Sequence, residues 1–164
     1  MAGSEADLLA LLRELDDPQW LEWPRNYDRS QIGVRFGDLV SRLDDGFAAH
    51  CTAHQDTQDS SEYGRVVVPG DATACGTRIV VCVSKFGSLA LVCADNPGAF
   101  LGTEEAQTEG ELDGADLTRV NRALVDLGYV VLSEELLESD YIGPSRLPSH
   151  VQRPTWWARF FGLF

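Results

Sequence analysis

Apolar residues recur with the period of a helix in three parts of the chain. A leucine stripe that begins at Leu8 predicts a helix over residues 4–16. The same spacing predicts helices over residues 30–47 and 116–127. Gly128 follows the third segment, where a left-handed cap would end a helix.

Two other apolar runs, residues 78–85 and 88–95, flank a short turn and predict an antiparallel hairpin. If Ser84 faces Leu89, the side chains on both faces of this hairpin are almost all apolar. A sheet with one face in water alternates apolar with polar residues. We therefore expect the hairpin to be central and covered on both sides.

Shorter apolar segments add further elements. Residues 64–69 and 129–132 predict strands, and residues 133–138 predict a short helix capped by Ser133. These elements place the central hairpin between other strands of one sheet.

Two polar segments interrupt this pattern. Residues 50–62 are expected to form an irregular strand or a loop, and residues 96–116 a loop. The order of elements indicates a single α+β domain over residues 1–164. Its mainly antiparallel sheet would have about four strands around the hairpin 78–85/88–95, covered by helices.

Aromatic residues gather near both ends of the chain. Residues 1–30 combine the first helix with an aromatic linker that contains Trp20, Trp23 and Tyr27. Residues 155–164 predict an aromatic C-terminal helix. We expect both segments to pack onto the body of the protein. Exposed, they would form contact patches, and a scaffold or regulatory subunit that docks through the C-terminal aromatics stays an alternative.

Charge gives the clearest functional signal. The chain has 13 basic and 26 acidic residues, a formal net charge of −13, which argues against nucleic-acid binding. Residues 95–140 contain 12 acidic residues and two arginines. Such a block predicts attraction of a basic protein partner. The carboxylates expected to steer it are Glu104, Glu105, Glu109, Glu111, Asp113 and Asp116, with Trp20, Trp23 and Tyr27 as anchors where exposed.

The segment 50–56 is the one cluster of metal-capable residue types. On a helix His50 and His54 would share a face, with Cys51 and Asp56 as further ligands. A small metal-binding or thiol enzyme built on this cluster is therefore an alternative function. No phosphate-binding, zinc-protease or serine-hydrolase motif is present, so we expect no cofactor and no assigned catalytic residue.

The four cysteines form no C-x-x-C pair, and Cys75 is the one expected to be exposed. The chain shows neither the signal-peptide pattern nor a long apolar run, so a reducing cytoplasm and no membrane contact are expected. Twelve arginines against the single Lys85 suggest a GC-rich bacterial gene. The leading hypothesis is a non-enzymatic immunity or antitoxin-type inhibitor of a basic bacterial toxin.

Overall fold

The central element is a five-stranded sheet with the strand order β1-β2-β3-β4-β5. The computed structural model describes residues 4–55, 58–148, 151 and 153–162. The first four strands form an antiparallel meander, and the fifth lies parallel to the fourth. Their bounds are β1 Thr52–Gln55, β2 Glu62–Val68, β3 Ile79–Ser84, β4 Leu89–Ala94 and β5 Val130–Leu132. The expected α+β class with a mainly antiparallel sheet is confirmed, with β1 as an additional edge strand.

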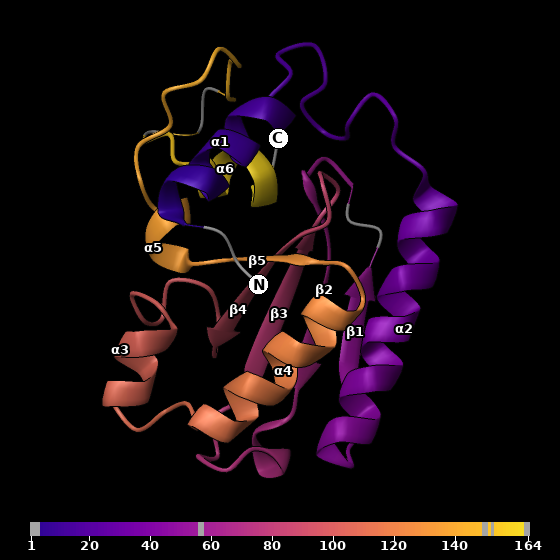
Figure 1. Cartoon of the computed structure of the whole chain (residues 1–164), viewed down its shortest axis with the longest axis vertical. Helices are drawn as coiled ribbons and strands as arrows, with labels where there is room; N and C mark the ends of the chain where they lie inside the picture. The colour runs from indigo at the N-terminus through magenta and orange to yellow at the C-terminus, as the bar shows by residue number, and fades with distance from the viewer. Residues whose placement is uncertain (1–3, 56–57, 149–150, 152, 163–164) are drawn as a thin grey trace.

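Helices cover both faces of this sheet (Figure 1). Their bounds are α1 Glu5–Leu15, α2 Arg29–Phe47, α3 Thr103–Thr108, α4 Gly114–Asp126, α5 Glu134–Leu137 and α6 Trp156–Phe161, with a 3-10 turn η1 at Gly70–Ala72. One apolar cluster joins α2 and α4 to the sheet, and the other joins α1, α5 and α6 to the opposite face. Two apolar layers therefore enclose the sheet.

The hairpin β3–β4 is the centre of the fold. Val83 pairs with Ala90, which is the register that the alignment of Ser84 with Leu89 predicts. Every residue of both strands is buried. Val81 belongs to the α2–α4 cluster, whereas its neighbour Cys82 belongs to the α1–α6 cluster. The expectation of a hairpin covered on both faces is confirmed.

The prediction of a loop over residues 96–116 is wrong for α3 and for the start of α4. Helix α3 runs from Thr103 to Thr108, and only Ala106 is buried on it. A helix that buries a single residue has no apolar stripe, so hydrophobic periodicity in the sequence does not predict it. Helix α4 starts at Gly114 because the carboxylate of Asp113 accepts hydrogen bonds from the first-turn N–H groups.

The aromatic helix α6 lies in the core. Trp156, Phe160 and Phe161 are buried against the sheet and α1. Residues 163–164 of the predicted C-terminal segment lie outside the described residues. Arg159 on this helix is 0% exposed and its guanidinium donates to the carboxylate of Asp16 at 2.7 Å. The helix is thereby tied to the end of α1.

Candidate functional site

The six carboxylates that the sequence singles out divide into two groups. Three of them serve the fold. Asp116 is buried and accepts a hydrogen bond from the backbone N–H of Ala74 at 2.8 Å. Glu111 accepts from the hydroxyl of Thr77, and Asp113 caps α4. Asp116 and Glu111 thus hold the loop after β2 against the start of α4, and Asp113 stabilises the first turn of that helix.

The other three carboxylates, Glu104, Glu105 and Glu109, are exposed on or next to α3. Glu105 accepts a hydrogen bond from the backbone N–H of Leu101. Within the described part of the chain, no hydrogen bond or ion pair involves the carboxylate of Glu104 or Glu109. Their charge therefore faces solvent without compensation.

Helix α5 adds two further carboxylates to this region. Glu135 and Glu138 are exposed, and the Glu135 carboxylate packs against Gly102, the residue that precedes α3. A Cβ atom at Gly102 would lie 2.1 Å from Oε1 of Glu135, which shows how closely the segments approach. Figure 1 shows α5 and α3 on the same side of the molecule. We call the exposed group Glu104, Glu105, Glu109, Glu135 and Glu138 the α3–α5 surface.

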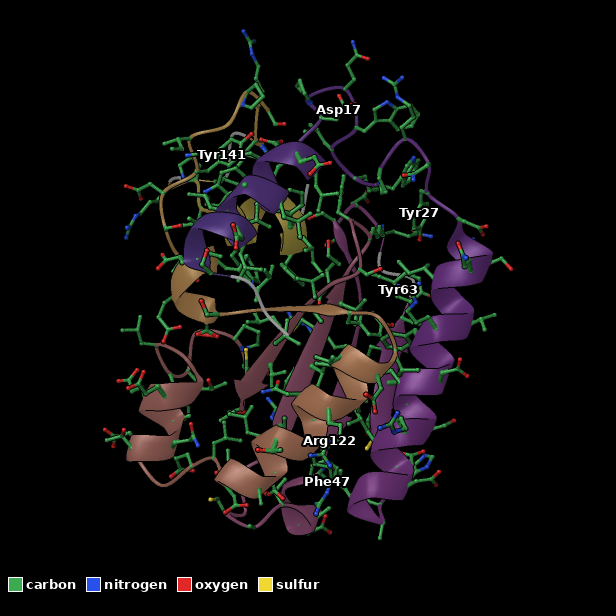
Figure 2. All side chains as sticks on the ribbon, viewed as in Figure 1. Asp17, Tyr27, Phe47, Tyr63, Arg122 and Tyr141 are labelled. Carbon is green, nitrogen blue, oxygen red and sulfur yellow. The ribbon has the colours of Figure 1, made fainter. Side chains whose placement is uncertain are left out.

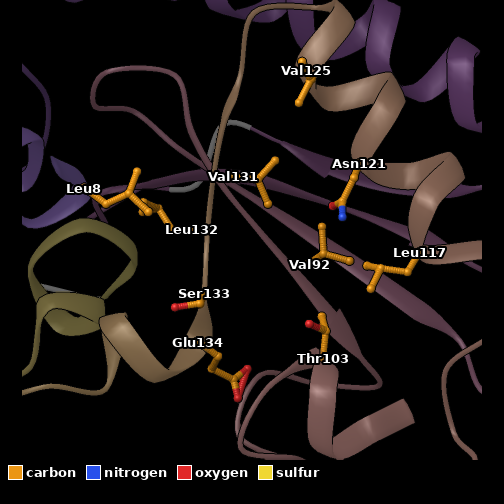
Figure 3. Close-up of a pocket in the computed structure, with 10 residues that line it drawn as sticks. All are labelled: Leu8, Val92, Thr103, Leu117, Asn121, Val125, Val131, Leu132, Ser133 and Glu134. Carbon is orange, nitrogen blue, oxygen red and sulfur yellow. The ribbon is translucent and has the colours of Figure 1, made fainter. Parts of the chain in front are cut away.

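A cavity of about 330 Å³ opens beside this surface. It lies where α1, α3 and α4 meet the edge of the sheet (Figure 3). Strand β5 pairs with β4 only as far as Leu132, because the chain then leaves the sheet at Ser133. The residues that line the cavity are Leu8, Val92, Thr103, Leu117, Asn121, Val125, Val131, Leu132, Ser133 and Glu134.

Beside six aliphatic side chains, four polar ones line this cavity, Thr103, Asn121, Ser133 and Glu134, and the last of these carries its charge. Glu134 is 5% exposed, and its Oε1 accepts a hydrogen bond from the thiol of Cys93 at 3.1 Å. Burial raises the pKa of the Glu134 carboxyl, opposed by the hydrogen bonds that it accepts from Cys93 and the backbone of Gly98. Oδ1 of Asn121 is buried and has no hydrogen-bond partner among the described residues. Both groups are acceptors that lack a full set of donors.

The predicted aromatic anchors lie away from the α3–α5 surface. Trp23 is 41% exposed and stacks on Tyr27 with 6.1 Å between ring centroids. They line a second cavity, of about 510 Å³, near the start of α2, whereas α3 lies towards the opposite end of the molecule (Figure 2). The backbone carbonyl of Trp20 accepts from Arg159, so this residue helps to hold the linker. The structure does not bring the aromatic and acidic groups into one site.

Lys85 lines the same second cavity and was not among the predicted site residues. Its ammonium lies 5.8 Å from the centroid of the Trp23 ring. Burial lowers the pKa of Lys85, although nearby Glu22 and Asp59 act in the opposite direction. The signal available in the sequence was its status as the one lysine of the chain.

The histidine and cysteine cluster does not form the arrangement that metal binding requires. Helix α2 ends at Phe47, and His54 lies on β1, so His50 and His54 share no helical face. Cys51 is buried, and burial together with Asp44 raises the pKa of its thiol to about 12. Asp56 lies outside the described residues. In the described ranges no three His, Cys, Asp or Glu side chains come close enough together to hold a metal ion.

Cys75 is exposed, as the sequence suggests, yet its surroundings do not activate it. Desolvation and the carboxylates of Asp113, Asp116 and Glu111 all raise the pKa of its thiol. Reactive thiols are instead found beside cations or at helix N-termini, which stabilise the thiolate. The Cys75 position therefore lacks the environment of a catalytic nucleophile.

The structure is an α+β domain in which a largely aliphatic cavity lies next to exposed carboxylates without ion-pair partners among the described residues. Comparison with known proteins gives no closer assignment, since no family model, curated protein or solved structure matches the chain. None of the helices in the described ranges combines the length and the apolar composition needed to cross a membrane.

Proposed function

We propose that the protein is a non-enzymatic binding protein that takes a basic protein partner on the α3–α5 surface. The supporting observation is the uneven pairing of carboxylates between residues 95 and 140. Away from this surface, four of them form ion pairs: Asp95 with Arg78, Asp116 with Arg119, Asp126 with Arg42 and Asp140 with Arg153. On the α3–α5 surface, no ion pair with a described residue is present.

Unpaired like charges on adjacent elements repel one another and destabilise the compact state. A cationic partner removes this repulsion when it binds. The field of such a surface also accelerates the encounter, and this acceleration decreases as salt is added. An acidic surface of this kind therefore favours both association and selection of a basic partner.

The specific form of this proposal is an immunity or antitoxin-type inhibitor of a basic toxin in a bacterial cytoplasm. A toxin that acts on nucleic acid presents cationic side chains to its substrate. The carboxylates of the α3–α5 surface compete for the same side chains. Inhibition of this kind requires binding and no catalytic group. The raised pKa values of the Cys51 and Cys75 thiols agree with this, because neither thiol is activated as a nucleophile.

The test is an association-rate measurement with the purified product of each gene adjacent to the one encoding this chain. One variant combines Glu104→Lys, Glu109→Lys and Glu138→Lys, and its matched control combines Glu14→Lys, Asp38→Lys and Asp45→Lys. All six residues are exposed, and both variants raise the net charge by the same amount. We expect a basic neighbour to bind about tenfold more slowly to the first variant and within about threefold of the wild-type rate to the control.

Two results would overturn the proposal. The first is that no basic neighbour forms a complex at low salt. The second is that both variants slow association equally, because total charge rather than the α3–α5 surface would then control binding.

A further inference from the structure

We propose that the cavity between α1, α3, α4 and β5 is a binding site for a small aliphatic primary ammonium ion. This site is distinct from the surface that would take a protein partner, and it does not depend on that partner. The inference follows from the size of the cavity, its aliphatic walls and the buried carboxylate of Glu134 that lines it.

The size and the walls of the cavity suit a short alkyl chain. Its volume of about 330 Å³ lies at the lower end of the range for ligand sites, roughly 300–1,000 Å³. An engineered apolar cavity of about 150 Å³ in another protein holds benzene, so this cavity has room for about twice as many atoms. Six aliphatic side chains line it: Leu8, Val92, Leu117, Val125, Val131 and Leu132.

The polar side chains of the cavity determine which head group the ligand would carry at the end of its alkyl chain. Glu134 and Asn121 line it from different elements, α5 and α4 (Figure 3). A carboxylate has about four acceptor positions, and the Cys93 thiol and the Gly98 N–H use two of those of Glu134. Asn121 Oδ1 has no donor from the described residues. An ammonium group has three N–H donors and no acceptor, so it can fill the remaining positions of the Glu134 carboxylate.

Charge distinguishes an ammonium ion from a neutral alcohol or an anion. A buried carboxylate without a counterion is unfavourable, and a bound cation supplies that counterion. The same burial that raises the pKa of Glu134 strengthens its attraction for a cation that is held nearby. The α3–α5 surface next to the opening adds negative potential, which repels anionic ligands.

The test is isothermal titration of the full chain at pH 7.5 with three probes of equal length, n-hexylamine, 1-hexanol and hexanoate. We expect saturable one-to-one binding of hexylamine, at least tenfold weaker binding of hexanol, and no binding of hexanoate. Glu134→Gln should weaken hexylamine at least tenfold and leave hexanol within threefold. The matched control Glu14→Gln, an exposed residue outside the α3–α5 surface, should leave the affinity for all three probes unchanged.

A second pair of variants tests the location independently of Glu134. Val125→Trp places a large ring at the half-exposed mouth of the cavity and should abolish binding of hexylamine. Val34→Trp, at an exposed position on α2, should leave it unchanged. The inference is overturned if hexylamine shows no saturable binding, if hexanoate binds equally well, or if Val125→Trp binds hexylamine like wild type. Because Val125→Trp alters only the cavity mouth, it also decides the question if Glu134→Gln does not fold.

Discussion

Replacement of Arg159 by methionine is expected to destabilise the protein more than any change on its surface. The Arg159 guanidinium is fully buried and donates to Oδ1 of Asp16 at 2.7 Å. It also donates to the backbone carbonyls of Asp17, Trp20 and Leu21. One side chain therefore joins α6, the end of α1 and the aromatic linker.

The magnitude follows from what the substitution leaves behind. Methionine fills much of the space, but the Asp16 carboxylate stays buried with the hydroxyls of Tyr141 and Ser145 as its donors and without a counterion. The loss of one partner of a buried ion pair costs about 3–5 kcal/mol. For a protein of this size such a loss lowers the melting temperature by roughly 6–20 °C.

Urea unfolding followed by tryptophan fluorescence measures this cost as a change in midpoint at constant slope. The double variant Asp16→Asn/Arg159→Met removes the uncompensated charge as well. It should therefore be less destabilised than the sum of the two single variants by at least 1 kcal/mol, a typical coupling for residues in contact. A cost below about 1 kcal/mol for Arg159→Met, or strict additivity, would refute the assigned role of the pair.

Three further predictions concern single positions. Glu134→Gln should reduce the pH dependence of stability between about pH 4 and 7. The raised native pKa of Glu134 makes the folded state hold a proton that the unfolded chain has released, so wild-type stability falls as the pH rises above about 4; urea midpoints from pH 4 to 7, with Glu14→Gln as control, measure this. Phe160→Ala should cost about 3–5 kcal/mol in the same assay, and an unchanged midpoint would contradict a core role for α6. Gly87→Ala should lower the free energy of unfolding by about 1–3 kcal/mol. Gly87 has φ +54°, and an added Cβ would lie 2.4 Å from a methyl group of Leu15. An unchanged free energy of unfolding would argue against this turn geometry.

Much of the fold was predictable because its central strands are almost entirely apolar and its long helices have regular apolar stripes. The hairpin β3–β4 has apolar residues at every position but one, which determined both its register and its burial. Strand β1 has four exposed residues, and α3 buries only Ala106. Strand β1 is held by its pairing with β2, and α3 by contacts with β4; neither buries an apolar stripe, so hydrophobic periodicity does not reveal them.

The candidate site was predictable only in part. The block of acidic residues identified Glu104 and Glu109, but the sequence could not show that Asp116 serves the fold or that Glu135 extends the same surface. The cavity draws its walls from segments between Leu8 and Glu134. Glu134 is one of three glutamates in the segment 133–138, and only the tertiary arrangement shows that this one is buried.

Hydrogen–deuterium exchange of the complex with the basic partner tests the central claim most directly. We predict slower exchange at residues 102–110 and 134–138 when the partner is bound, with residues 17–28 and β1 unchanged. Protection confined to the aromatic linker or to β1, with α3 and α5 exchanging as in the free protein, would contradict the account.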